Sequence, residues 1–165
     1  MKLIFTIILL CFSITACLAA KPITSEVDGF VFWKSETIDA ASERLYKKLG
    51  DKRLVYEVIG NYQGHSMYLV LRGKTSSPEL HETESDFQIS IRGKATLQMG
   101  GELINPVKHP RKQQRGDAIH GADIYQLSAG DIIHVPPATP HLLVIDPDEP
   151  YLYLLIKIDE EPLLK

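Results

Sequence analysis

Short runs of alternating apolar and polar residues, separated by glycine and proline, occupy most of the chain after residue 50. Side chains in a strand point alternately to opposite faces, so this alternation predicts strands with one buried face. The predicted strands span residues 52–59, 65–72, 86–92, 95–99, 124–127, 131–135, 141–145 and 151–158. Many short strands divided by such turns are typical of an antiparallel sandwich or barrel. The sequence therefore predicts an all-β fold.

One segment before the strands has helical spacing instead. Ile38, Leu45 and Leu49 fall on one face of a helix spanning residues 35–49, and Gly50 follows as a stop signal. Because only one face of this helix is apolar, we expect it to lie across the outside of the sheet in a structural role.

The start of the chain has the features of an export signal. Lys2 precedes an apolar run from residue 3 to residue 14, which is too short to span a bilayer comfortably, and small residues follow it. Two cleavage routes are open. Processing at Cys17, in a sequence similar to a bacterial lipobox, would leave a membrane-anchored lipoprotein, whereas cleavage near Ala19 or Ala20 would release a soluble periplasmic protein. Both routes predict an exported protein.

These features divide the chain into a signal at residues 1–20, a helix and leading strand at 21–64, and a barrel at 65–165. Both cysteines lie in the signal, so a mature domain has neither a disulfide framework nor a thiol nucleophile. The formal net charge of −3 gives no electrostatic reason to expect nucleic acid or an anionic membrane surface as a partner.

Residues 102–122 interrupt the strand pattern with a long polar segment that contains two prolines and two glycines. The sequence predicts a solvated surface loop here. The alternative is a lid over the mouth of the barrel, because long loops in compact domains are often functional.

Two stretches of the chain combine glycine, histidine and β-rich sequence. The first runs from Glu79 to Gly93, and the second runs from Gly130 to His141. Together they resemble the paired motifs of the cupin superfamily. The second stretch keeps the family's spacing of glycine, proline and histidine, with Ala138 in place of the usual second glycine.

The first stretch is a degraded version of its motif, because one of the two family histidines is missing. Asp86 takes the position of the family's glutamate, seven residues before the closing glycine. One alignment then places His81 at the second histidine position and Glu79 at the first. The other alignment makes His81 the first histidine and puts Thr83 in the place of the second.

The resemblance implies an antiparallel jelly-roll β-barrel that holds a divalent transition ion inside it. Iron, manganese, zinc and nickel all accept imidazole and carboxylate ligands. The ligands that the resemblance implies are His81, Asp86 and His141, joined by Glu79 or, in the other alignment, Thr83. The alternative is a barrel that kept its shape and lost its metal, in which His141 and Asp86 belong to a polar network.

Strand alternation decides whether Asp86 can be a ligand at all. If Asp86 points inward, so do Gln88 and Ser90, which we expect to orient a small polar substrate. Phe87 and the isoleucines at alternate positions after it then point outward and need cover from the helix, an N-terminal strand or a second subunit. The last of these predicts a homodimer. In the opposite phase the apolar set points inward and Asp86 lies outside.

Two further histidines are candidate pocket residues. His65 begins a predicted strand on an apolar face, where a histidine either lies at the rim or lines a pocket. His134 lies between Ile133 and Val135 and either joins the site or faces the rim.

Two hypotheses for function follow. The first is an exported, metal-dependent enzyme that acts on a small polar molecule, and the second is a metal-free binding or sensing module that uses the same cavity. A structural protein is a third, weaker interpretation. The fold does not choose among them. The sequence contains no serine–histidine–aspartate triad motif, phosphate loop or zinc ribbon that would offer a competing mechanism.

Overall fold

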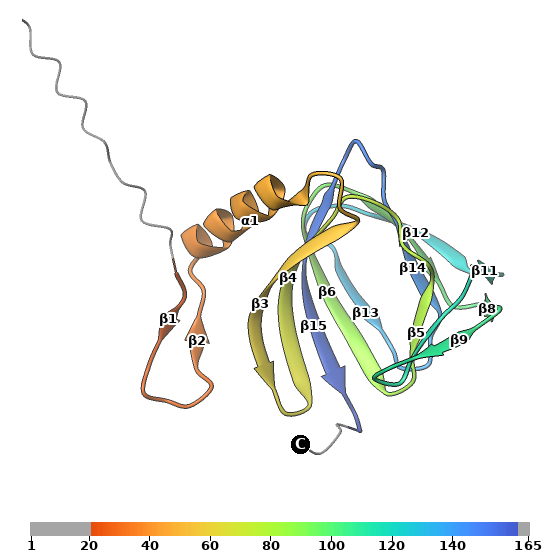
Figure 1. The fold of residues 1–165 in the computed structure, drawn as a ribbon, viewed down its shortest axis with the longest axis horizontal. Helices are drawn as coiled ribbons and strands as arrows, with labels where there is room; N and C mark the ends of the chain where they lie inside the picture. Colours follow the sequence, from red (N-terminus) through yellow and green to blue (C-terminus); the bar gives the residue numbers. More distant parts are fainter. Residues whose placement is uncertain (1–20, 162–165) are drawn as a thin grey trace, which may run out of the picture.

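The computed structural model describes residues 21–161, so the predicted signal at 1–20 lies outside the described residues. The helix α1 spans Ser35–Leu49 and precedes a barrel of antiparallel strands (Figure 1). Among the described residues, no helix has both the length and the apolar character needed to cross a membrane.

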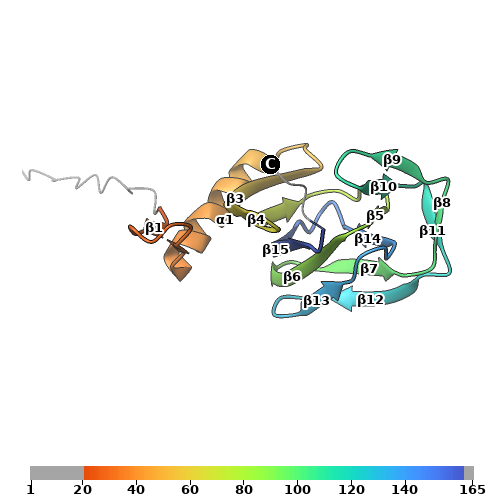
Figure 2. The ribbon, with the colours of Figure 1, turned by 90° about the horizontal axis from the view of Figure 1, so that it is seen from below.

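Two antiparallel sheets form the walls of the barrel. The five-stranded sheet has the order β13 (Ile132–Val135), β6 (Glu84–Arg92), β15 (Tyr151–Asp159), β4 (His65–Arg72) and β3 (Leu54–Tyr62). The six-stranded sheet has the order β12 (Asp123–Leu127), β7 (Ala95–Met99), β14 (His141–Val144), β5 (Glu79–His81), β10 (Gln113–Arg115) and β9 (Val107–His109). Figure 2 shows the two sheets facing each other as layers. The predicted all-β jelly-roll barrel with one N-terminal helix is confirmed.

Two small ribbons complete the fold. β1 (Ile23–Thr24) pairs with β2 (Val31–Phe32) before the helix, and β8 (Glu102–Ile104) pairs with β11 (Ala118–His120) at the far end of the six-stranded sheet. The loop predicted for residues 102–122 is therefore wrong, because this segment forms the strands β8 to β11. Nearly all of their side chains are exposed or half-buried, so pairing of backbone groups rather than apolar alternation defines them.

The interior between the sheets divides into an apolar core and a polar cavity. The apolar core includes Val70, Leu97, Val135, Leu143 and Tyr151, all of which are buried. Apolar side chains therefore close one part of the barrel interior and leave the polar residues of β5, β6 and β14 to line the other.

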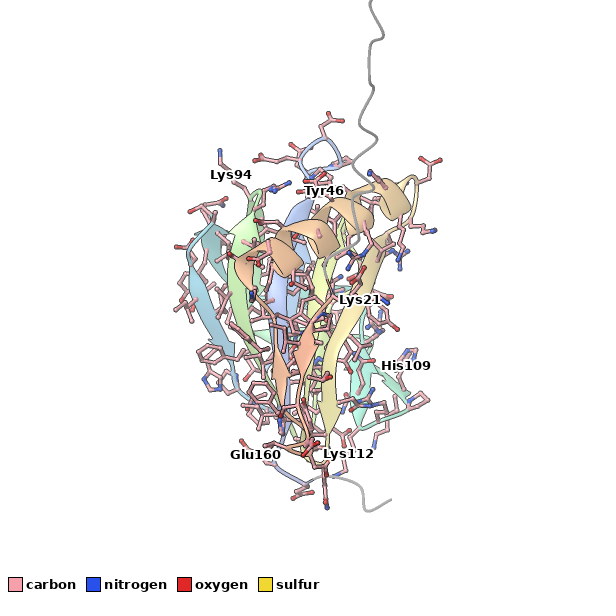
Figure 3. All side chains as sticks on the ribbon, turned by 90° about the vertical axis from the view of Figure 1, so that its left-hand side faces the viewer. Lys21, Tyr46, Lys94, His109, Lys112 and Glu160 are labelled. Atoms are coloured by element: carbon pink, nitrogen blue, oxygen red, sulfur yellow. The ribbon has the colours of Figure 1, made fainter. Side chains whose placement is uncertain are left out.

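A second core lies on the outer face of the five-stranded sheet, under helix α1. Ala41 and Leu45 of the helix pack there against Leu69, Leu71 and Leu152, and all five are fully buried. Burial of a leucine side chain contributes about 1.5–3 kcal/mol, so this contact fixes the helix on the sheet. Figure 3 shows α1, with Tyr46 labelled, crossing one end of the sheet, while Lys112 lies at the opposite end of the barrel.

A β-bulge in β6 shifts the alternation of this strand under the helix. Leu152 pairs with Arg92 and Tyr153 pairs with Ser90, so Ile91 is an extra residue. Ile91 packs against the helix core, and the Arg92 guanidinium lies 5.2 Å from the centre of the Tyr46 ring. Ile91 and Arg92 therefore both face the helix. Before the bulge, regular alternation directs Asp86, Gln88 and Ser90 into the barrel.

Candidate metal centre

A cavity of about 200 Å³ opens between the two sheets. Most of the residues that line it are polar or charged. The ionisable residues and histidines that line it include Glu79, His81, Glu84, Asp86, His141 and Lys157. This volume is smaller than that of most sites for drug-sized ligands, so the cavity suits a small molecule.

Cross-strand pairing brings three of these residues together. Glu79 and His81 lie on β5 two residues apart and therefore on one face of the strand, and His141 of β14 pairs directly with Glu79. Asp86 reaches the same point from β6 in the opposite sheet. His81, Asp86 and His141 are each at most 5% exposed.

The distances within this group match the spacing of ligands around one ion. His141 Nε2 lies 3.7 Å from Glu79 Oε1 and 3.7 Å from Asp86 Oδ2, and His81 Nε2 lies 3.6 Å from Asp86 Oδ2. One ligand atom from each of Glu79, His81 and His141 lies within 4.8 Å of the others. Four tetrahedral ligands at about 2.0–2.1 Å from zinc would be about 3.4 Å apart. Small side-chain movements therefore suffice to bring these atoms around an ion.

The tautomer of His141 leaves a lone pair directed into the cavity. Its Nδ1 lies 3.0 Å from the carbonyl oxygen of Thr139, which can only accept, so Nδ1 carries the proton and donates. Nε2 is then unprotonated, and it has no hydrogen-bond partner within the described part of the chain. Burial lowers the pKa of His141, which favours the neutral ring that binds metal ions.

Lys157 of β15 brings a cation to the same group. Its Nζ donates to Asp86 Oδ1 at 2.6 Å, lies 3.1 Å from His81 Nε2, and lies 3.3 Å from Glu84 Oε2. Burial lowers the pKa of Lys157, but the carboxylates of Asp86 and Glu84 outweigh it and hold the pKa above its ordinary value. The ammonium therefore uses the Nε2 lone pair of His81 that an ion would also need.

Asp86 is an ionised carboxylate in spite of its burial. Burial raises its pKa, but His81 and Lys157 outweigh that effect and hold the pKa well below its ordinary value. One oxygen, Oδ1, accepts from Lys157, and the other, Oδ2, faces both histidines. Asp86 therefore presents a charged oxygen to the cavity at neutral pH.

Glu79 is held in place by two arginines. Arg115 pairs with its Oε2 at 2.6 Å, and Arg72 lies 3.7 Å from its Oε1. Burial raises the pKa of Glu79, but His141 and the two arginines outweigh it and hold the pKa below its ordinary value. Arg72 is also fixed by the hydroxyl of Tyr153, to which its Nε donates at 2.9 Å.

The remaining residues proposed from the sequence lie in different places. Gln88 lines the cavity, whereas Ser90 is buried outside its lining and hydrogen-bonds the hydroxyl of Tyr151. Thr83 donates to Asp159 Oδ1 at 2.7 Å and does not line the cavity, so the structure supports the alignment that uses Glu79.

His134 is exposed on the outer face beside Phe87, because its neighbours Ile133 and Val135 take the inward positions. His134 is therefore not a residue of this cavity.

A second pocket of about 250 Å³ adjoins the first. Glu84, Arg111 and Lys157 line both pockets and form their junction. His65 lines the second pocket, where its ring stacks on Tyr62 with centroids 4.8 Å apart. His65 thus belongs to the outer pocket and not to the candidate metal centre.

Sequence reasoning missed the cations of the site. Lys157 is an isolated cation in the last apolar strand, and its alternation with Tyr153 and Leu155 could have placed it inside the barrel. Arg72 closes the strand 65–72 in the same way. Arg115 lies in the segment interpreted as a loop, where the sequence carries no strand signal that would have oriented it.

Solved structures with a similar fold come from several bacteria. A candidate mannose-6-phosphate isomerase from Ralstonia eutropha JMP134 matches with a TM-score of 0.50 and 16% identity over 67% of this chain and 88% of that one. A protein from Thermus thermophilus matches with a TM-score of 0.50 and 14% identity, over 72% of this chain and 93% of that one. A cupin-2 domain from Rhodospirillum rubrum matches at a lower TM-score of 0.47, with 14% identity over 68% and 66% of the two chains.

Comparison of sequences adds nothing to these matches, since no protein-family model and no curated protein matches the chain. The barrel is the cupin fold, as the two sequence stretches indicated. At identities this low the likeness extends to the fold alone, and the function has to be argued from the site.

Proposed function

We propose that this cupin-fold chain binds a divalent transition ion through His81, His141 and the carboxylates of Glu79 and Asp86, and binds a small polar molecule beside the ion. The observation that carries the proposal is the Nε2 lone pair of His141. It is buried, it is fixed by the Thr139 carbonyl, and it has no hydrogen-bond partner among the described residues. Buried nitrogens are almost always paired, so an orphan beside two carboxylates and a second imidazole is best explained by an ion.

The donor set suits iron, manganese, zinc or nickel, because imidazole and carboxylate are ligands that all four accept. Aspartate is one methylene shorter than the glutamate usual in the family, which could have kept Asp86 out of reach. Its Oδ2 nevertheless lies 3.6 Å and 3.7 Å from the two imidazole nitrogens. The strand position of Asp86 thus compensates for its shorter side chain.

An ion at this position would act as a Lewis acid toward a carbonyl or hydroxyl of the bound molecule. The chain's own residues hold the ligands and shape the cavity. Arg115 and Arg72 orient Glu79, and Thr139 fixes the His141 ring. Gln88 has a buried side-chain oxygen without a partner among residues 21–161 and lines the cavity, so it can accept a hydrogen bond from a substrate.

A second candidate function is a metal-free binding or sensing module. One specific observation favours it: the Lys157 ammonium already contacts Asp86, Glu84 and His81 Nε2. A permanent internal cation could take the place of the ion and leave the cavity to bind a small molecule without chemistry.

Metal analysis separates the two functions. The protein is purified without added metal and examined by elemental analysis, and chelator-treated protein is titrated with Mn²⁺, Fe²⁺, Zn²⁺ and Ni²⁺ by calorimetry. We expect one ion per chain, lost in His81→Ala and His141→Ala but retained in the matched control His134→Ala, because His134 lies on the outer face. Absence of binding by all four ions to a folded wild-type protein would reject the metal function and leave the second candidate.

We also propose, from the sequence of residues 1–20, that the chain is exported to the periplasm or anchored to a membrane through a lipid on Cys17. The intact mass of the mature protein tests this proposal, and the expected result is stated in the Discussion.

A further inference from the structure

The charges around the cavity balance only while no ion is bound. Three cations line the cavity, Arg72, Arg111 and Lys157, and they face three carboxylates, Glu79, Glu84 and Asp86. The Arg111 guanidinium lies at the junction with the outer pocket, 3.2 Å from Glu84. A divalent ion held by neutral histidines would therefore leave an excess of at least two positive charges.

A buried excess of charge is costly unless a counter-charge accompanies it. The lining of the cavity offers no further carboxylate to provide one. The counter-charge has to enter with the ion, because Arg72 and Lys157 are held inside the barrel at 11% and 13% side-chain exposure. A bound molecule with a negatively charged group would supply that counter-charge.

The geometry points to one position for the charge. When an ion takes the Nε2 lone pair of His81, Lys157 loses that contact and keeps Asp86 and Glu84. The N–H group of Lys157 that no longer contacts His81 lies at the junction of the two pockets. Arg111 lines the same junction. Arg111 is 66% exposed at its side chain, so it remains accessible to an incoming molecule.

We propose that the molecule bound beside the ion is a small organic anion, whose carboxylate or phosphate is held by Lys157 and Arg111 at the junction of the two pockets. This inference rests on the proposed metal function. It further requires that the ion and the anion bind cooperatively, because each removes the excess charge that the other would create. The same charge count disfavours neutral sugars and alcohols as ligands.

The experiment compares anions with neutral molecules of similar size. Calorimetry measures the binding of glycolate, glycolamide, glycerol 1-phosphate and glycerol to chelator-treated protein and to protein loaded with Mn²⁺ or Zn²⁺, whichever binds more tightly. A charge-assisted contact should make at least one anion bind about tenfold more tightly than its neutral partner in the loaded protein. The carboxylate and phosphate arms distinguish the two sources of negative charge.

Two variants locate the contact. Lys157→Met should remove the preference for the anion while the ion still binds, and Arg111→Met should reduce it. The control Lys108→Met replaces an exposed lysine of β9 and should leave the preference unchanged. These expectations concern affinities, so they do not depend on knowing the reaction.

Each outcome has a defined meaning. Absence of ion binding rejects the proposed metal function itself. Ion binding without an anion preference, or with equal anion binding in the absence of the ion, overturns only the present inference. A preference that persists in Lys157→Met overturns the assigned position of the anion.

Discussion

Replacing Lys157 with methionine tests the competition between the internal ammonium and the ion. Methionine is similar in length and keeps the apolar stem but removes the charge. In the ion-free protein the variant loses the contacts of Nζ to His81 Nε2, Asp86 and Glu84. Breaking a buried ion pair from one side costs about 3–5 kcal/mol, because the partner charge is left uncompensated.

The effect on ion affinity has the opposite sign. The contact between Lys157 and His81 exists only without the ion, whereas the contacts to Asp86 and Glu84 can persist when the ion is bound. A hydrogen bond to a charged group is worth about 1.5–3 kcal/mol, so removing this competitor should tighten ion binding by about 10- to 100-fold. The variant also removes the repulsion between the Lys157 ammonium and the ion, which should tighten ion binding further.

Two measurements are needed. Urea unfolding in the presence of a chelator gives the stability of the ion-free protein, and calorimetry gives the affinity for Mn²⁺ or Zn²⁺. The control is Lys112→Met, because Lys112 pairs with Glu161, whose side chain is 73% exposed, and such a pair contributes at most about 1 kcal/mol. Unchanged or weaker ion binding by a folded Lys157→Met protein would refute the competition.

Three other predictions concern different parts of the molecule. The pKa of Asp86 is lower in the folded protein than in the unfolded chain, so the stabilising effect of this carboxylate is complete above the ordinary pKa of 3.8 and is lost as the pH falls toward the folded pKa. Urea midpoints measured from pH 6 to pH 3 should therefore fall less steeply in Asp86→Asn than in wild type. Equal slopes would show that Asp86 does not govern this loss of stability. Material from the native host should lack at least residues 1–16, and its intact mass should reveal either a lipidated Cys17 or a chain that begins after Ala19 or Ala20; a full-length chain from Met1 would contradict export. The half-buried Phe87 and Ile89 on the outer face of β6 lead us to expect a homodimer by sedimentation velocity, and a monomer at every concentration would reject it.

The fold could be predicted from sequence where apolar alternation is strong. Helix α1 and strand β4 have the predicted bounds of 35–49 and 65–72, because each buries a regular apolar face against the sheet or the helix. The strands of residues 102–122 could not be predicted, since they have few buried apolar side chains. The short strand β5 was also missed, although it carries Glu79 and His81.

The candidate site was only partly accessible from sequence. Family spacing drew attention to His81, Asp86 and His141, and these three residues lie together in the structure. Lys157 and Arg72 did not stand out because each is a single cation near the end of an apolar strand. The register of the sheet agrees with the inward position that alternation with Tyr153 and Leu155 gives Lys157. His134 was ambiguous because both of its neighbours are apolar, and the inward phase of β13 settled its position.

The bulge at Ile91 has a consequence for how the length of this chain can change over evolution. Asp86 and Gln88 before it line the cavity, whereas Ile91 and Arg92 contact the helix. Gain or loss of one residue beyond the bulge alters packing under the helix but leaves the orientation of Asp86 unchanged. The same event between Asp86 and Ser90 would turn the carboxylate to the outer surface. Descendants that retain the candidate ligands are therefore expected to tolerate length changes after Arg92 and to conserve the length of the strand from Glu84 to Ser90.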